Sequence, residues 1–334
     1  MTTFGWILNL AAELELADPQ GFAPSTRLAC RVAAQGRRFL DICNTAAPAG
    51  VRHVAVPERS DIVLAWCPTP HARASAASRL VGPSLPVLQR ANHRAFAAER
   101  APTLPGARFV TDLERLRTHA LEYPGVRTWL WKRPFGFAGR ARKRVDGDPG
   151  SAALRWAAAA MEGQGGGLLV EPWVTIEAEF AQHAWLGVDG QCLLGDPTRT
   201  RCDTAGAWQT SHSGSAGLLA DEVAALRRTA LSLAGDLHRL GYHGPFGIDA
   251  YRWRDDRGAP HFVPCGELNA RFTMGWFVGF AARPEVWEVL RNASLRESPG
   301  VARQESTGGT SGEVRPCDPA AADGTGGARE VVRP

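Results

Sequence analysis

Residues 246–271, FGIDAYRWRDDRGAPHFVPCGELNAR, constrain the fold more than any other stretch of this chain. Two runs rich in aromatic and β-branched residues flank a short polar segment, DDRG, which favours a tight turn. The pattern predicts an antiparallel hairpin in which Asp249 lies close to Glu267. Because side chains alternate between the two faces of a strand, Glu267, Asn269 and Arg271 are expected on one face.

This hairpin carries the side chains of a metal and phosphate site. Carboxylate and amide oxygens are hard ligands that suit Mg²⁺, which also keeps phosphate oxygens and waters. We interpret Asp249, Glu267 and Asn269 as ligands of Mg²⁺, with Mn²⁺ as an alternative. Arg271 beside them would neutralise a charged oxygen during transfer. An ordinary hairpin with a solvated polar face is the competing interpretation.

Length and composition narrow the class of protein. A chain of 334 residues allows two or three domains. No run approaches the length of a membrane span, and the first residues lack the basic start of a signal peptide, so residues 6–16 are expected to form a strand. Seven cysteines without a C-x-x-C pair indicate reduced thiols in a cytoplasmic protein rather than a zinc or disulfide framework.

A basic loop follows one of the rare lysines. Of the 38 basic residues only two are lysines, and one of them, Lys132, ends the predicted strand TWLWK. The loop behind it contains Gly136, Gly139 and Arg140. Glycines let backbone N–H groups approach an anion, while Lys132 supplies a point charge and Arg140 a clamp for a terminal phosphate. A solvated basic turn and an RNA-contacting patch remain alternatives.

A buried strand, LLV, then ends at Glu171, Pro172 and Trp173. Such a segment is suited to run beside an adenine ring, with backbone groups meeting the edge of the base. Glu179 follows eight residues after Glu171, where a carboxylate would accept hydrogen bonds from ribose hydroxyls. A charge at a strand end and a charge on an edge strand are the respective alternatives.

The remaining patterns set the order of the elements. Residues 1–85 alternate between strands and helices, which predicts a small, open, parallel α/β layer. The polar stretch 196–217 is expected to be a surface loop, with a mobile loop over a site as the alternative, and neither His183 nor His212 is assigned a catalytic role. Helices are predicted from Ser25 onward and over 86–99, 111–121, 151–161, 221–240 and 284–292, and strands over 61–66, 105–110, 127–132, 168–174 and 183–194.

Taken in order, the lysine with its glycine-containing loop, the VEPW segment, the following acid, GID and ELNAR resemble the ATP-grasp superfamily. The resemblance covers about residues 86–295. It implies an N-terminal α/β domain (1–85), a central ATP-grasp subdomain (86–170) and a C-terminal one (171–297), two α+β subdomains that clasp ATP. Residues 298–334 are rich in Gly, Ser, Thr, Pro and charge and are expected to be a disordered tail.

The resemblance also implies an activity and roles for residues. Members use ATP and Mg²⁺ to activate a carboxylate as an acyl phosphate, which an amine then attacks. The matching positions are Lys132 for the α- and β-phosphates, Gly136 to Arg140 for the loop over the β- and γ-phosphates, Glu171 to Trp173 for the adenine hinge, Glu179 for the ribose, Asp249, Glu267 and Asn269 for the metal, and Arg271 with Lys132 for catalysis.

Two departures concern the charges around the acyl group. Pro172 stands where many members carry a basic residue, and Gly247 stands where related ligases place an arginine. Either Arg271 supplies the missing charge, or it comes from one of three other arginines: Arg199, Arg201 or Arg252.

The expected partners are small-molecule carboxylate and amine (or peptide) substrates, without nucleic acid or membrane, and the resemblance allows a homodimer. Three other functions stay open: a phosphotransferase with a hydroxyl acceptor, a non-catalytic nucleotide-binding scaffold, and an RNA-binding module that uses residues 140–144. The modest net charge of +4 argues against the last.

Overall fold

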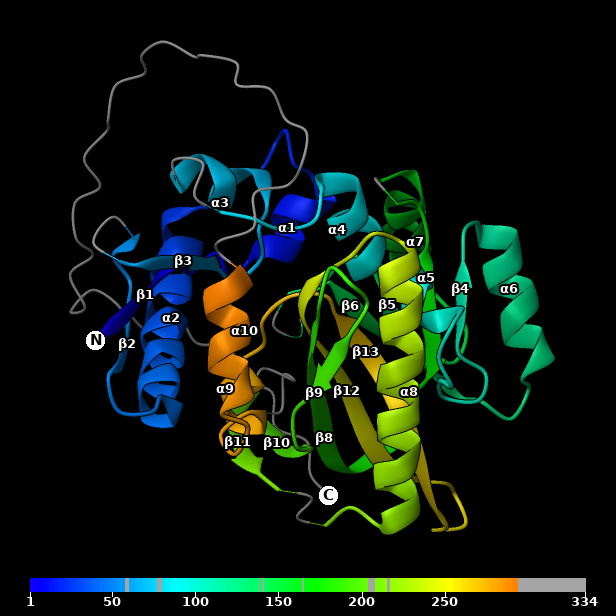
Figure 1. Ribbon diagram of the computed structural model, residues 1–334. Helices are drawn as coiled ribbons and strands as arrows, with labels where there is room; N and C mark the ends of the chain where they lie inside the picture. Colours follow the sequence, from blue (N-terminus) through cyan, green and yellow to red (C-terminus); the bar gives the residue numbers. More distant parts are fainter. Residues whose placement is uncertain are drawn as a thin grey trace, which may run out of the picture.

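The computed structural model describes residues 1–293, apart from 58–59, 77–79, 138, 140, 164, 204–207 and 215–216. Arg140 of the basic loop and the tail expected over 298–334 lie outside the described residues. Within the described part, the strands form three sheets that follow one another along the chain (Figure 1). None of the helices in this part has the length and apolar character needed to cross a membrane.

The first sheet is the parallel α/β layer that the sequence predicts. Its strand order is β2-β1-β3, and both pairings are parallel. The long helix that joins the first two strands starts where expected, because the Ser25 hydroxyl accepts a hydrogen bond from the Leu28 N–H at 3.3 Å. The elements are β1 (Thr2–Ile7), α1 (Ala12–Ala17), α2 (Thr26–Ala46), β2 (Val51–Val54), β3 (Ile62–Ala65) and α3 (Pro70–Ser75).

The strand predicted over residues 6–16 is wrong beyond Ile7, because α1 occupies its second half. The alternation of Leu and Glu in this segment looked like a half-solvated strand. Both acids are instead buried: Glu15 accepts hydrogen bonds from the Thr69 hydroxyl and the His71 N–H, and Glu13 accepts one from Arg271. Long-range partners therefore decided the local structure here.

The helix predicted over 86–99 is broken into α4 (Leu85–Asn92) and α5 (Arg94–Ala98). His93 between them has extended backbone dihedrals, and its side chain accepts a hydrogen bond from the Ala95 N–H at 3.2 Å. The histidine thus caps a second helix, which no proline or glycine marks in the sequence.

The second sheet is antiparallel, with the order β4-β7-β5-β6. Two helices, α6 and α7, pack on it around a core of its own that includes Trp129, Trp131 and Val170. Figure 1 shows this unit at the right of the molecule. Its elements are β4 (Arg108–Val110), α6 (Leu113–Glu122), β5 (Thr128–Lys132), β6 (Arg142–Asp146), α7 (Ser151–Glu162) and β7 (Leu168–Pro172).

The third sheet contains the predicted hairpin. Its order is β11-β10-β8-β12-β13, and β9 also pairs with β8. Asp249 pairs with Glu267 across the hairpin, which confirms the predicted register. The elements are β8 (Thr175–Leu186), β9 (Cys192–Leu194), β10 (Thr198–Cys202), β11 (Trp208–Ser213), α8 (Ala220–Arg239), β12 (Gly244–Arg254), β13 (Pro260–Asn269), α9 (Trp276–Gly279) and α10 (Glu285–Ala293).

The expectation of a surface loop over 196–217 is wrong, since β10 and β11 lie in this segment. They pair with each other, and β10 also pairs with β8, so the segment extends the third sheet. Its polar composition reflects strands near an edge of the sheet, whose backbone is hydrogen-bonded although many side chains are exposed.

The largest core joins the first and third sheets. The ring of Trp6 from β1 lies 4.9 Å from Phe272, just after β13, and 5.8 Å from Phe277 of α9, measured between ring centres. Leu88 of α4 and Phe96 of α5 belong to this core, not to that of the second sheet. The domain boundaries after residues 85, 170 and 297 stay predictions.

Candidate active site

A cavity of about 580 Å³ lies between the second and third sheets, with a wall from the first layer. It gathers every predicted site residue that the structure describes; Arg140 is not among the described residues. The predicted residues that line it are Lys132, Gly136, Gly139, Glu171, Pro172, Trp173, Glu179, Asp249, Glu267, Asn269 and Arg271.

A larger cavity, of about 1010 Å³, lies beside β3 and the β8–β9 turn. Of the predicted site residues it contains only Arg271, and its walls are mostly apolar, including Val63, Trp185 and Leu193. The charged side chains that phosphate chemistry needs line the smaller cavity, so that one is the candidate active site.

The predicted metal ligands lie together on the hairpin. Asp249 and Glu267 are paired across β12 and β13, and the Asn269 amide donates to Asp249 Oδ2 at 2.9 Å. The surrounding protein and the negative charge of Glu267 raise the pKa of Asp249 to about 7. A cation between the two carboxylates would relieve this repulsion. The donor set therefore fits Mg²⁺.

The protein offers this ion only part of its coordination shell. Within the described residues no group of three or more His, Cys, Asp or Glu side chains is placed to hold a metal. Two carboxylates and one amide oxygen would leave the other positions to water and phosphate oxygens, as is usual for Mg²⁺.

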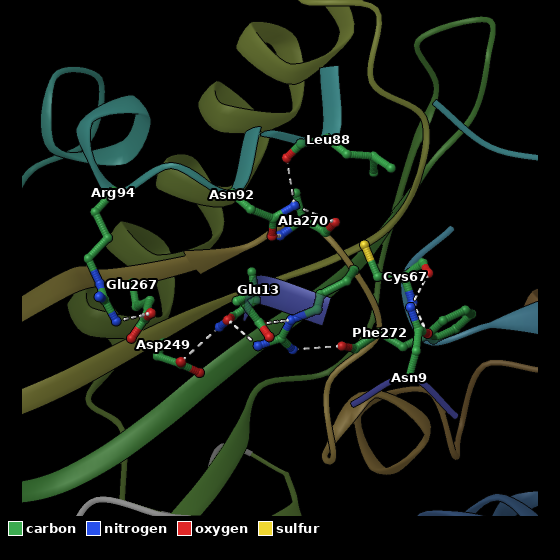
Figure 2. A network of polar contacts seen from close by, with 12 residues as sticks. Asn9, Glu13, Cys67, Leu88, Asn92, Arg94, Asp249, Glu267, Ala270 and Phe272 are labelled. Atoms are coloured by element: carbon green, nitrogen blue, oxygen red, sulfur yellow. Dashed lines mark hydrogen bonds and ion pairs between the residues drawn. The ribbon is translucent and has the colours of Figure 1, made fainter. Parts of the chain in front are cut away.

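Arg94, which the sequence analysis did not single out, holds Glu267. Its guanidinium lies 2.8 Å from Glu267 Oε1, and Figure 2 shows the two side chains directed at one another from α5 and β13. Burial acts to raise the pKa of Glu267, but the positive charges of Arg94, Lys132 and Arg271 outweigh it and lower that pKa. Glu267 is thus the ionised partner of the carboxylate pair.

Lys132 of β5 and Glu171 of β7 form an ion pair between neighbouring strands of the second sheet. Lys132 Nζ lies 2.5 Å from Glu171 Oε2, because β5 and β7 are hydrogen-bonded neighbours. The Glu171 side chain is buried and held by the lysine. Trp173 is 45% exposed, and the Arg144 guanidinium lies 4.8 Å from its ring centre, so one face of the ring is covered.

The basic loop between β5 and β6 has left-handed backbone at two of its described residues. Gly139 has φ 71° and Ala141 has φ 59°, and alanine adopts this left-handed region only at a cost. The Arg133 N–H donates to the Ala141 carbonyl at 2.9 Å and closes the loop. Gly136 and Gly139 line the cavity, which supports the predicted approach of backbone amides to a phosphate.

Glu179 lies on β8 and faces the cavity next to β10. The Cys202 thiol donates a hydrogen bond to it, and burial together with the Glu179 charge raises the pKa of this thiol far above its usual range. The cysteine therefore orients the carboxylate as a neutral donor. Cys202 was not foreseen, because β10 was expected to be a loop.

Arg271 joins the hairpin to the first layer. Its Nη2 donates to Asn269 Oδ1 at 3.0 Å, its Nε donates to the buried Glu13, and its guanidinium carbon lies 5.2 Å from the Trp66 ring centre. Figure 2 shows Glu13 at the centre of this polar network. Burial outweighs the attraction of Arg271 and raises the pKa of Glu13.

The alternative sources of positive charge do not reach the cavity. Arg252 is held by Glu222 at 2.8 and 2.5 Å, and Arg199 and Arg201 are exposed on β10. None of these three lines the cavity, whereas Arg271 does. Among the four arginines considered, Arg271 is the one placed to act on a bound substrate.

Comparison with protein-family models gives no match, and comparison with curated proteins gives none either. Solved structures do resemble the chain. A biotin carboxylase from Campylobacter jejuni, in complex with β,γ-ATP, gives a TM-score of 0.55 at 16% identity, over 73% of this chain and 56% of that one. This chain thus spans little more than half the length of that enzyme.

Two further structures match over nearly their whole length. A D-alanyl-alanine synthetase A from Vibrio cholerae gives a TM-score of 0.52 at 10% identity, over 88% of this chain and 99% of that one. A D-cycloserine synthetase gives 0.51 at 15% identity, over 86% and 100%. These likenesses establish the ATP-grasp fold and confirm the predicted fold class.

Proposed function

We propose that this chain of ATP-grasp fold is an ATP- and Mg²⁺-dependent ligase that joins a carboxylate to an amine through a carbon–nitrogen bond. The observation that carries the proposal is the meeting, in one cavity, of Lys132, the Asp249–Glu267–Asn269 group and Arg271. The structurally similar biotin carboxylase, D-alanyl-alanine synthetase and D-cycloserine synthetase support it.

The polar and charged groups of the cavity suit the phosphates, ribose and base of a nucleoside triphosphate. Lys132 and the loop amides at Gly136 and Gly139 would bind its phosphates, while Glu179 would accept from the ribose and the Glu171 carbonyl from the base. Asp249, Glu267 and Asn269 would hold Mg²⁺. When bound, this ion supplies neutralisation of the charge on the phosphate oxygens.

The reaction has two steps. A carboxylate oxygen of the substrate attacks the γ-phosphorus, and the bond from that phosphorus to ADP breaks. The amine nitrogen then attacks the acyl carbon, loses a proton, and inorganic phosphate leaves. Arg271 lies where it can pair with the negative oxygens of the acyl phosphate, since the guanidinium is fixed by Asn269 and Glu13.

The direct test follows ADP and inorganic phosphate over a panel of carboxylates paired with amines. We expect Lys132→Ala and Glu267→Ala to lose turnover while they keep the folded state, as circular dichroism would verify. Full activity in both variants would contradict the proposal. The exposed Arg115→Ala on α6 serves as a charge-removal control that leaves turnover unchanged.

Other outcomes of the same assay identify other functions. ADP formed with a stable phosphorylated product, and no free phosphate, would indicate a phosphotransferase. ATP binding without turnover over the whole panel would indicate a scaffold. Cytoplasmic location, small-molecule substrates and a homodimer remain predictions that accompany the proposed activity.

A further inference from the structure

We propose that Thr273, oriented by the buried His183, is the hydrogen-bond acceptor that positions the attacking amine. This inference rests on the proposed ligase function and deepens it, because it names the residue that meets the nucleophile. Both side chains line the candidate active site. Thr273 follows Arg271 by two positions, and Arg271 also lines the cavity.

The two side chains belong to a chain of hydrogen bonds. His183 Nδ1 lies 3.1 Å from Thr273 Oγ1, and His183 Nε2 lies 3.2 Å from Thr198 Oγ1. All three residues are buried, with exposed fractions of 2% for His183, 0% for Thr198 and 9% for Thr273. Both nitrogens of the imidazole are therefore used inside the protein.

Three glycines make the space for this imidazole. A Cβ atom on Gly247 would lie 3.1 Å from His183 Nδ1, one on Gly275 would lie 3.0 Å from Nε2, and one on Gly279 would lie 2.8 Å from Cδ2. Real Cβ atoms essentially never approach closer than 3.0 Å, which excludes one at Gly279, and the 3.0 and 3.1 Å contacts are tighter than most real ones. The ring is thus held in a slot that only glycines leave open.

The direction of these hydrogen bonds follows from Thr198, at the other end of the series from Thr273. The Thr198 hydroxyl lies 3.5 Å from the Ala181 carbonyl, which can only accept, so its hydrogen is assigned to that carbonyl and its oxygen accepts from His183 Nε2–H. Burial lowers the pKa of His183 to about 3, and the neutral ring then has no hydrogen on Nδ1. Nδ1 accepts from the Thr273 hydroxyl.

The consequence is that the Thr273 hydroxyl, whose side chain lines the cavity, has no hydrogen left to donate and can only accept from a bound group. An anionic carboxylate or phosphate oxygen would be repelled by the Thr273 oxygen, because neither carries a hydrogen. Such an oxygen can instead accept from the Arg271 guanidinium, which only donates. An N–H group is what the Thr273 oxygen can bind. The Thr273 oxygen would thus bind the amine, while the Arg271 guanidinium, two positions away, would bind the acyl phosphate.

The first test measures the direction of the hydrogen bonds and needs no activity. Nitrogen-15 NMR of histidine-labelled protein, with the His183 signals identified by their loss in His183→Gln, reports which ring nitrogen carries the hydrogen. We expect a neutral ring protonated on Nε2 throughout pH 6 to 8. A ring protonated on Nδ1 would overturn the inference, since Thr273 would then be free to donate.

The second test uses hydroxylamine as the amine, with any carboxylate that supports ADP release. We expect Thr273→Val to raise the KM for hydroxylamine about tenfold or more, the loss of one hydrogen bond, with the KM for ATP within about twofold of wild type. Thr273→Ser should restore the wild-type value. Thr229→Val, a buried threonine on α8 outside the cavity, is the matched control.

This design distinguishes a failure of the Thr273 role from a failure of the ligase function. An unchanged KM for hydroxylamine in an active Thr273→Val enzyme overturns the role of Thr273 and leaves the ligase function intact. A wild-type protein that releases no ADP with any carboxylate contradicts the ligase function itself, whatever the NMR result.

Discussion

Arg94 and Glu267 are separated by 173 positions in the sequence and by 2.8 Å in space. The same arginine donates to the Arg133 carbonyl at 2.6 Å, immediately after β5. One side chain thus connects the short helix α5, the start of the basic loop and the hairpin of β12 and β13. It fixes the position of Glu267 relative to Lys132. The proposed phosphate chemistry requires these two side chains together.

Removal of this arginine should destabilise the protein. Arg94→Met would leave the Glu267 carboxylate without its nearest counter-charge, and we expect a loss of about 3 kcal/mol in the free energy of unfolding. Urea titration followed by circular dichroism measures it. The exposed pair of Arg115 and Asp112, 3.3 Å apart, is the matched control, and Arg115→Met should cost less than about 1 kcal/mol. Equal effects of the two variants would contradict this account.

Lys132 and Glu171 should behave as one unit in a double-mutant cycle. Lys132→Met leaves a buried carboxylate unpaired, while Glu171→Gln leaves an unpaired ammonium, so each change alone is costly. The double variant should cost less than the sum of the two, with a coupling energy above about 1 kcal/mol in urea unfolding. Additive effects would mean that the 2.5 Å contact contributes no net energy.

The affinity for Mg²⁺ should rise with pH through about 7. The ordinary pKa of Asp249, 3.8, is raised to about 7 in the folded protein, so the folded state favours the protonated group. Its contribution to stability is present below about pH 4 and is lost as pH rises through 7. Mg²⁺ must displace this proton, so stabilisation by Mg²⁺ should be larger at pH 8 than at pH 6.

Thermal unfolding at both pH values, with and without Mg²⁺, measures this difference. Asp249→Asn cannot ionise and should abolish the pH dependence of the Mg²⁺ effect. A wild-type protein that Mg²⁺ stabilises equally at both pH values would contradict the assignment of Asp249.

The slot around His183 should not accept a methyl group. Gly279→Ala would place a Cβ 2.8 Å from His183 Cδ2 and 3.1 Å from the Asp196 carbonyl oxygen, and we expect a loss of about 1–3 kcal/mol in stability. Gly125→Ala has open space around the new atom and should change stability by less than about 0.5 kcal/mol. Similar unfolding midpoints for both variants would show that the ring can move.

The sequence predicted those parts of the site that depend on local patterns. The hairpin register that pairs Asp249 with Glu267 follows from alternation and a short turn, and Lys132 follows from its place at a strand end. Glu13 and Arg94 could not be found in this way, because they reach the site from other elements. Their partners are distant in the sequence, and nothing local distinguishes them from surface charges.

The failed predictions of elements have the same origin. Residues 12–17, 198–202 and 208–213 were assigned from their polarity, yet burial of Glu13 and pairing of β10 with β8 and β11 determine their structure. His183 is a similar case: its surroundings include glycines and threonines from three separate segments. Tertiary contacts of this kind override local propensity.

Every proposed step requires that the cavity binds MgATP, and thermal unfolding with MgATP, MgADP or Mg²⁺ alone measures this binding. A ligand that binds only the folded state at a hundredfold excess over its Kd stabilises it by about 2.7 kcal/mol. We expect MgATP to raise the unfolding midpoint of the wild type clearly above its midpoint with Mg²⁺ alone. For Lys132→Ala, we expect the same midpoint with MgATP as with Mg²⁺ alone. The absence of any MgATP shift in the wild type at millimolar concentration would contradict the account.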